Sequence, residues 1–282
     1  MRSLLLLLPL LLPAQPRDGT ILERSACKPN EPADARFTCE KLTYSSDQLP
    51  VIAYLYSPAN VSGRLPVVVY NRGSYVVKDQ LSNLLPMFKR LAEAGFLIVA
   101  PMYRGSEGAP GRDEMGGADL HDLMNAVPLI RNLTAADEDN LFLYGVSRGG
   151  IMCMLALRDG FPARAAATIG AITDLAAYLQ RDSRAARLVH TIWPDYDSRR
   201  EEILFTRSAS QWAEKLKRPI LLMHGGADPQ VDPLHSLKLA MRLQELGHPY
   251  GLTIFAGGDH NLNQFSAERD QQAIQWFKKH LR

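Results

Sequence analysis

Three residues of this 282-residue chain have side chains that together could activate a nucleophile. Ser147 lies in Gly145-Val146-Ser147-Arg148-Gly149, Asp228 ends a later glycine turn, and His260 ends the turn after that. A serine hydroxyl is a poor nucleophile until a base removes its proton and a third group orients that base. Ser, then an acid, then His is one of the orders in which such groups occur along a chain. We therefore expect Ser147 to attack an acyl carbon, with His260 as the base and Asp228 as its orienting partner.

The segment around Ser147 has the sequence of a sharp turn between a strand and a helix. Residues 141–144 form an apolar run of strand type, and residues 151–157 form an apolar run of helix type. The flanking glycines let backbone pack closely around a residue held in strained geometry. Such a turn, a nucleophile elbow, lifts the hydroxyl clear of the sheet. The alternative is a plain turn in a binding protein without catalysis.

Other titratable residues compete for the roles of acid and base. Asp232 is expected to cap the next helix, and Asp259 adjoins His260, so its carboxylate would have difficulty reaching that ring. His224 also ends a strand, but it precedes Asp228, which is the wrong order for the base. We expect His224 to have a structural or supporting role. His260 itself has one alternative, as a cap of the last helix.

The oxyanion that develops during acyl transfer needs two hydrogen-bond donors. The first is expected to be the backbone N–H of Arg148, directly after the nucleophile. The second should come from the loop after the apolar run at residues 66–70. There the Asn71 side-chain amide, the Arg72 N–H and the Gly73 N–H are all candidates, and the sequence does not choose among them.

The elements that must position these residues alternate along the chain. Residues 36–44 and 51–56 are expected to form an N-terminal β-hairpin. Beyond it, apolar runs of strand length alternate with helical patterns, which is typical of an α/β fold with a mostly parallel, doubly wound sheet. The expected strands are 66–70, 96–100, 141–145, 165–169, 220–223 and 252–255, and the expected helices are 80–94, 120–131, 148–158, 233–246 and 264–280. The candidate residues then share the carboxyl edge of the sheet, where such folds bind ligands.

One stretch interrupts this alternation, at about residues 174–218. It is rich in arginine and aromatic residues and is far longer than a crossover needs to be. We expect a helical lid insertion that lies over the carboxyl ends of the strands. The alternative is a solvated helical excursion that makes no contact with a ligand.

Charge and composition limit the partners of this chain. A formal net charge of +2, without a basic run interleaved with aromatic residues, gives no sign of a nucleic-acid groove. The expected partner is a small peptide or ester, and no pattern indicates an oligomeric state. An acidic cluster is present, but it lacks the ligand spacing of a metal site, and we expect neither a metal nor another cofactor. Its members are Asp113, Glu114, Asp119, His121 and Asp122, of which Asp119 and Asp122 are expected near a helix N-terminus.

The N-terminus has the pattern of a targeting segment. Residues 1–14 combine a short positive start with an apolar core too short to span a bilayer comfortably. We expect a signal peptide cleaved after Ala14, and hence a secreted or periplasmic protein without stable membrane insertion. An uncleaved segment would instead be a membrane anchor. Residues 15–35 are expected to be a polar lead into one catalytic domain, residues 36–282.

The three cysteines fit an oxidising compartment. Cys27 and Cys39 lie close together in the sequence and could form a disulfide. Cys153 would then remain a free thiol on the helix after Ser147, and its apolar neighbours favour a buried packing role.

Several motifs agree with one known family. They are Tyr103-Arg104-Gly105-Ser106 after a strand, Gly116-Gly117-Ala118-Asp119 before a helix, residues 145–150, the lead from Trp212 to Pro219 into residues 221–225, and Asp259-His260. From about Tyr44 to the C-terminus, the chain resembles the prolyl-oligopeptidase-like serine hydrolases, the S9 peptidase catalytic domain of the α/β-hydrolase superfamily. The resemblance implies an α/β-hydrolase fold, a triad of Ser147, Asp228 and His260, and a serine-type peptidase that acts on short peptides.

Two features depart from the pattern of that family. The segment before Tyr44 is too short for the β-propeller that gates the site in many oligopeptide-cleaving members. Asn71-Arg72-Gly73 stands where many relatives have a Tyr or His before paired glycines. A carboxylesterase acting on small esters, which the same triad would serve, is therefore an alternative, and a catalytically silent binding protein is a further one.

Overall fold

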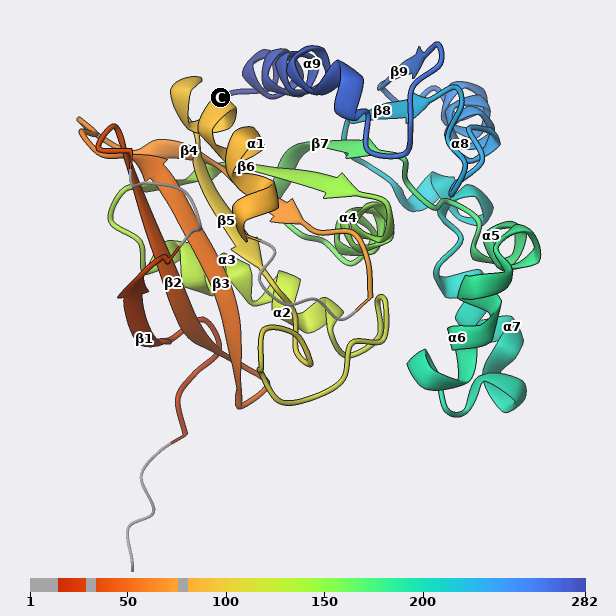
Figure 1. Ribbon diagram of the computed structural model, residues 1–282, viewed down its shortest axis with the longest axis horizontal. Coiled ribbons are helices and arrows are strands. Elements are labelled where there is room, and N and C mark those ends of the chain that lie inside the picture. Colours follow the sequence, from red (N-terminus) through yellow and green to blue (C-terminus); the bar gives the residue numbers. More distant parts are fainter. Residues whose placement is uncertain (1–14, 29–33, 76–80) are drawn as a thin grey trace, which may run out of the picture.

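The computed structural model describes residues 15–28, 34–75 and 81–282, so the expected signal peptide lies outside the described residues. Within them, nine strands form one sheet in the order β1-β2-β3-β5-β4-β6-β7-β8-β9 (Figure 1). The six strands β5, β4, β6, β7, β8 and β9 are parallel to one another. Strands β1, β2 and β3 form an antiparallel edge beside β5. The expected mostly parallel, doubly wound α/β sheet is confirmed.

Each expected strand is present, with bounds that differ by a few residues. The strands are β1 (Ile21–Ala26), β2 (Phe37–Ser46), β3 (Leu49–Pro58), β4 (Leu65–Asn71), β5 (Leu97–Pro101), β6 (Ala136–Val146), β7 (Ala163–Ile169), β8 (Ile220–Gly225) and β9 (Tyr250–Phe255). β2 and β3 form the expected hairpin, and Asp47 and Gln48 at its turn both have positive φ. Two positive φ values fit a type I′ turn, whose twist matches that of the flanking strands.

Strand β1 lies inside the segment that the sequence suggested as a polar lead. It pairs antiparallel with β2 at the edge of the sheet. Five of its six residues are exposed, so no alternation of apolar and polar residues marks it in the sequence. Pairing with a neighbouring strand, rather than burial, therefore orders this segment.

The helices follow the expected pattern with one exception. They are α1 (Leu81–Glu93), α2 (Leu120–Met124), α3 (Ala126–Arg131), α4 (Arg148–Arg158), α5 (Leu175–Arg181), α6 (Ser183–Ile192), α7 (Tyr196–Thr206), α8 (Leu234–Glu245) and α9 (Ser266–Lys279), with short 3-10 turns η1 (Ala209–Gln211), η2 (Ala213–Lys215) and η3 (Asn263–Phe265). The single helix expected at residues 120–131 is wrong, because α2 and α3 are separate. Pro128 lacks the N–H that would bond to the Met124 carbonyl, and the break falls at Asn125.

Helices cover both faces of the sheet. Successive β4 side chains point to opposite faces, so Val67 and Val69 join one apolar cluster and Val68 and Tyr70 join the other. Helices α1 and α9 pack on the face of Val68, and α2, α3, α4 and α8 pack on the opposite face. Burial on both faces explains why the parallel strands are continuous apolar runs.

Helices α5, α6 and α7 join β7 to β8 and form a group beside the sheet (Figure 1). Two side chains fix this group to the loop before α2. The Trp193 indole N–H donates to the Glu114 carbonyl at 2.8 Å, and Arg207 Nε donates to the Met115 carbonyl at 2.8 Å. The position of the group relative to the loop is therefore set by hydrogen bonds to backbone.

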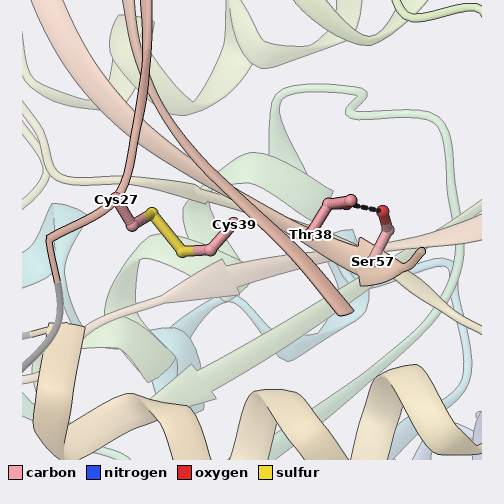
Figure 2. Close-up of a disulfide and its surroundings, with 4 residues drawn as sticks. All are labelled: Cys27, Thr38, Cys39 and Ser57. Atoms are coloured by element: carbon pink, nitrogen blue, oxygen red, sulfur yellow. Dashed lines mark hydrogen bonds between the residues drawn. A yellow bond between two sulfur atoms is a disulfide. The ribbon is translucent and has the colours of Figure 1, made fainter. Parts of the chain in front are cut away.

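Cys27 and Cys39 form a disulfide between the end of β1 and strand β2, as Figure 2 shows. The Cys27 N–H also donates to the Cys39 carbonyl at 3.0 Å. Cys153 is a free, buried thiol on α4, as its apolar neighbours suggested. Across the described part of the chain, none of the helices combines the length and the apolar character needed to cross a bilayer.

Candidate active site

Ser147 stands alone between β6, which ends at Val146, and α4, which begins at Arg148. Its φ of 55° and ψ of −119° are unusual for a residue with a side chain. The Ser147 N–H donates to the Ile169 carbonyl at 2.8 Å, which ties the turn to the neighbouring strand. A Cβ at Gly149 would collide with the Asn71 carbonyl, so only glycine permits this approach. The turn therefore has the geometry of a nucleophile elbow.

Asp228 and His260 are brought together by the loops after β8 and β9. His260 Nδ1 lies 2.7 Å from Asp228 Oδ2, and both side chains are buried. The other carboxylate oxygen, Oδ1, accepts from the N–H groups of Gln230 at 2.8 Å and Val231 at 3.0 Å. This arrangement orients the imidazole and leaves its Nε2 to act as a base.

The Asp228 carboxylate is kept ionised by its partners. Burial would raise the pKa of Asp228, but hydrogen bonds from His224 and His260 outweigh this effect and hold that pKa well below its usual value. A carboxylate with a lowered pKa stays charged while a histidine titrates. Asp228 therefore meets the requirement for the group that stabilises an imidazolium.

Ser147 and His260 line one cavity of about 850 Å³. Its walls come from the loop after β4, from α1, α5 and α6, and from the loop that carries His260. Gly170, at the end of β7, has a φ of 54°, and a Cβ there would lie 3.0 Å from His260 Nδ1. Glycine at this position therefore leaves room for the imidazole ring, a role that no local sequence signal indicated.

The structure separates the oxyanion candidates. The Arg148 N–H is the first of α4, where helix amides have no partner within the helix. The Asn71 amide is excluded, because Nδ2 donates to the Val69 carbonyl, Oδ1 accepts from Tyr103, and the side chain is fully buried. Gly73 faces the nucleophile, since a Cβ there would lie 3.3 Å from Ser147 Cβ.

The Arg72 side chain organises the loop that contains Gly73. Its Nη1 donates to the carbonyls of Gly73 at 3.1 Å and Ser74 at 2.9 Å, and Nε donates to the Met102 carbonyl at 3.1 Å. The Arg72 guanidinium therefore fixes the loop that holds Gly73, and the backbone amides of Arg148, Gly73 and Arg72 remain the candidate oxyanion donors.

One buried carboxylate connects both of these elements. Asp113 Oδ2 accepts from Arg72 Nη2 at 2.8 Å, and Asp113 Oδ1 accepts from Arg148 Nη2 at 2.5 Å. Asp119 pairs with the same Arg148 amine at 2.6 Å, and both guanidinium groups lie over the Tyr103 ring. Two arginines and two carboxylates thus form a charge-balanced group that connects the loop after β4 with the start of α4.

The acidic cluster of the sequence is therefore an ion-pair network. Asp119 precedes α2 as expected, but its carboxylate accepts from the Gly116 and Gly117 amides rather than capping the helix. Asp122, within α2, pairs with Arg104 at 2.7 Å. Glu114 accepts from the Ala118 N–H, and His121 pairs with Asp47. Among the described residues, no group of three or more metal-ligating side chains is present.

The competing residues have other partners. Asp232 accepts from the Leu234 N–H at 3.0 Å, before α8, and Asp259 accepts from the Asn263 N–H at 2.9 Å. His224 is fully buried: its Nε2 lies 3.0 Å from the Val231 carbonyl oxygen and 3.2 Å from Asp228 Oδ2, and its Nδ1 lies 2.7 Å from Ser236 Oγ. The supporting role expected for His224 is therefore contact with the acid that orients His260.

The sheet, the elbow at Ser147 and the Asp228–His260 pair define a hydrolase of the α/β class. The family model described as the prolyl oligopeptidase family matches residues 85–282. The chain belongs to this family, the S9 peptidases, and it is a serine hydrolase. The resemblance inferred from the sequence motifs is confirmed.

The matched relatives differ in length. An uncharacterized peptidase of Bacillus subtilis, YtmA, is 27% identical over 239 residues, which cover 84% of this chain and 92% of that protein. Acylamino-acid-releasing enzyme 2 of rice (Oryza sativa) is 26% identical, over 83% of this chain but only 32% of the relative. The chain thus spans most of the bacterial relative and about a third of the plant one.

Solved structures share the fold. A puromycin-hydrolyzing peptidase of Mycobacterium tuberculosis superposes with a TM-score of 0.75 at 22% identity, covering 89% of this chain and 40% of that one. An acetyl xylan esterase of Paenibacillus superposes with a TM-score of 0.71 at 16% identity, covering 92% of this chain and 88% of that one.

Proposed function

We propose that this serine hydrolase is a peptidase that cleaves short peptides through an acyl-enzyme formed on Ser147. The observation that carries the proposal is the buried 2.7 Å contact between Asp228 and His260, whose ring lines the same cavity as Ser147. In the first step, Ser147 Oγ attacks the peptide carbonyl carbon while His260 Nε2 accepts the proton of the Ser147 hydroxyl. The N–H groups of Arg148 and Gly73 stabilise the oxyanion.

His260 then acts as an acid, and afterwards as a base again. The imidazolium of His260 donates its proton to the leaving amine, which departs and leaves an ester on Ser147. Water then attacks this ester while His260 accepts a proton from the water; the bond between the acyl group and Ser147 Oγ breaks, the imidazolium returns the proton to Ser147 Oγ, and the carboxylic acid leaves. Asp228, whose pKa is held low by its hydrogen bonds to His224 and His260, stays ionised throughout and stabilises the imidazolium.

The cavity walls support a short substrate with an apolar side chain. Helix α6 lines the cavity with Ala185, Leu188 and Ile192, which lie on one face of the helix. Leu188 is 41% exposed and adds apolar surface to the cavity wall. We assign residues 174–218 as a lid whose α6 face contacts the substrate.

A carboxylesterase is the second candidate. The observation in its favour is the acetyl xylan esterase, whose length this chain nearly matches, with 88% of that protein covered. The same nucleophile, base and oxyanion donors would act on an ester, whose leaving group departs more readily than an amine.

Parallel assays separate the two. Purified protein is given matched substrates that differ only in the scissile bond, an aminoacyl amide and the corresponding acyl ester, with Ser147→Ala as the control. A peptidase hydrolyses both and loses both activities in the variant. Ester turnover without amide turnover would reject the peptidase proposal and favour the esterase.

We also propose that the protein is exported. The apolar run at residues 4–12 and the disulfide between Cys27 and Cys39 support a secretory route. N-terminal sequencing of the protein from its native host tests this: a mature chain that begins near Gln15 supports export, and an intact Met1 contradicts cleavage.

A further inference from the structure

Arg269 is a buried arginine in the wall of the catalytic cavity. It lies in the first turn of α9, only 8% of its surface is exposed, and it lines the same cavity as Ser147 and His260. Nε donates to Asp270 Oδ1 at 3.1 Å, and Nη1 donates to the Asn261 carbonyl. Within the described residues, Nη2 has no hydrogen-bond partner. One face of this guanidinium is therefore available to a ligand.

The charge of Arg269 is only partly compensated. Its carboxylate partner, Asp270, is fully buried and also pairs with Arg90 at 2.5 Å and accepts from the Tyr144 hydroxyl at 3.0 Å. Two guanidinium groups thus share one carboxylate, and one positive charge remains in excess. A buried charge without full compensation is unfavourable until an anion pairs with it.

The rest of the cavity offers little to cancel this charge. Arg72 and Arg148 also line it, but Asp113 and Asp119 balance them. Among the described lining residues, Asp182 is the only carboxylate. It stands at the start of α6, where it accepts from backbone amides. The cavity therefore favours a substrate that brings its own negative charge.

The position of Arg269 relative to His260 indicates which part of the substrate carries that charge. Asn261, whose carbonyl binds Arg269, directly follows His260 in the chain. His260 donates its proton to the leaving group, so the departing part of the substrate lies on this side of Ser147. A guanidinium beside the His260 loop thus faces the leaving group rather than the acyl group.

We infer that Arg269 binds a free carboxylate on the leaving group, so that the enzyme prefers peptides cleaved next to their C-terminus. The inference rests on the proposed peptidase function and names its substrate class. A carboxylate is the anion that every peptide carries at this end, and charge-assisted hydrogen bonds from arginine to carboxylate are among the strongest in proteins.

The test compares substrates that differ only in this charge. The peptide pair is Ala-Ala-Phe with a free C-terminus and the same peptide with a C-terminal amide. The ester pair is 4-acetoxyphenylacetate and its primary amide, whose phenol leaving groups differ in charge but little in reactivity. Each pair is assayed with wild type, Arg269→Met, Arg269→Lys and, as a matched control, Arg131→Met, which removes an exposed arginine outside the cavity.

The wild type is expected to favour the free acid in kcat/KM by roughly 10-fold to 100-fold, mainly through KM. Arg269→Met should abolish this preference, because kcat/KM for the free acid falls by roughly 10-fold to 100-fold more than kcat/KM for the neutral member. Arg269→Lys should retain part of the preference, because it keeps the charge, and Arg131→Met should retain all of it.

The outcomes are distinct. Equal rates for the charged and neutral members with wild type would overturn the inference. So would an equal loss on both members in Arg269→Met, because that would show that Arg269 only anchors the His260 loop. Peptides that are cleaved without discrimination leave the peptidase proposal standing while this inference fails. Inert peptides together with a discriminating ester pair would reject the peptidase proposal and support the carboxylate site.

Discussion

Two buried groups of charged residues flank Ser147, and they pair their carboxylates with different bases. On the side of the β8 and β9 loops, Asp228 contacts two imidazoles, those of His260 at 2.7 Å and His224 at 3.2 Å. We call this group the histidine side. Imidazole, as a chemical group, can take up and release a proton during a reaction.

On the opposite side, the carboxylates pair with guanidinium groups. Asp113 bridges Arg72 and Arg148, and Asp119 also pairs with Arg148. We call this group the arginine side. Guanidinium does not lose its proton in proteins, so the charges here do not change during a reaction.

The difference separates two tasks that a serine hydrolase must perform. A proton has to move between the nucleophile and the leaving group, which needs a base that changes its charge. The oxyanion donors must stay in place while this happens, because their benefit depends on fixed geometry. We propose that the histidine side performs the first task and that the arginine side holds the backbone around Gly73 and Arg148 for the second.

The largest expected effect comes from changing the carboxylate of the histidine side. Asp228→Asn should lower kcat about 10⁴-fold, because an amide no longer fixes the proton on His260 Nδ1 and cannot stabilise the imidazolium. Rates on the preferred substrate check this, with circular dichroism to show that the variant is folded. A folded Asp228→Asn protein that loses less than tenfold would remove Asp228 from the role assigned here.

A smaller loss is expected from the arginine side. Asp113→Asn should lower kcat about 100-fold with little change in KM, since the oxyanion donors lose their support while substrate contacts remain. The pH dependence of kcat/KM should keep its shape, because no proton-transfer group is altered. Thermal unfolding is followed in parallel, since loss of a buried partner destabilises by about 3–5 kcal/mol. An unchanged kcat in the folded variant would contradict this support.

The pH dependence of kcat/KM in His224 variants tests the histidine side most sharply. His224→Phe removes a donor from Asp228 Oδ2, so the carboxylate binds the His260 imidazolium more strongly and the acid limb of kcat/KM moves to higher pH. The rate at neutral pH should fall less than about tenfold. His224→Gln keeps a donor and should restore the wild-type profile.

The acid limb of the kcat/KM profile should report one titrating group, because Asp228 stays ionised. Its lowered pKa keeps it ionised over the range in which a histidine titrates, so the wild-type acid limb should have the slope of one proton. A shift of the limb to lower pH in His224→Phe, or the same profile in the Phe and Gln variants, would contradict the role of His224.

The smallest effect on catalysis is expected from removing the disulfide, which belongs neither to the histidine side nor to the arginine side. Figure 2 shows the disulfide between Cys27 and Cys39, and neither cysteine is among the described residues that line the cavity. Replacing both cysteines by serine should leave kcat and KM within about twofold and lower the free energy of unfolding by about 3 kcal/mol, measured with urea. Wild type unfolded in reducing buffer should match the variant. A large loss of kcat would show that the N-terminal strands influence the site.

The residues of the histidine side follow local patterns in the sequence, whereas the contacts of the arginine side do not. Ser147, Asp228 and His260 each follow an apolar strand, so a local pattern places all three at one edge of the sheet. Asp113 pairs with Arg148 across 35 residues, and no local pattern reports such a contact. The acidic cluster was noticed in the sequence, but its partners depend on the folded loops.

The same reason explains the other differences. Asn71 is a reasonable oxyanion donor by position, but its Nδ2 donates to the Val69 carbonyl, and Tyr103, 32 residues away, donates to its Oδ1 and fixes the side chain in that orientation. Strand β1 is ordered by pairing with β2, and its exposed side chains carry no pattern. Arg269 is one arginine among many in the sequence, and only its shared carboxylate and its place in the cavity distinguish it.

The most direct test of the central claim is labelling of the purified protein with a fluorophosphonate probe, followed by intact mass measurement and peptide mapping. Ser147 on its strained elbow beside the histidine side should give one adduct per chain, located on the peptide that contains Ser147, and Ser147→Ala should give none. Absence of labelling under conditions in which another serine hydrolase reacts, or an adduct on a different residue, would contradict the assignment of Ser147 as the nucleophile.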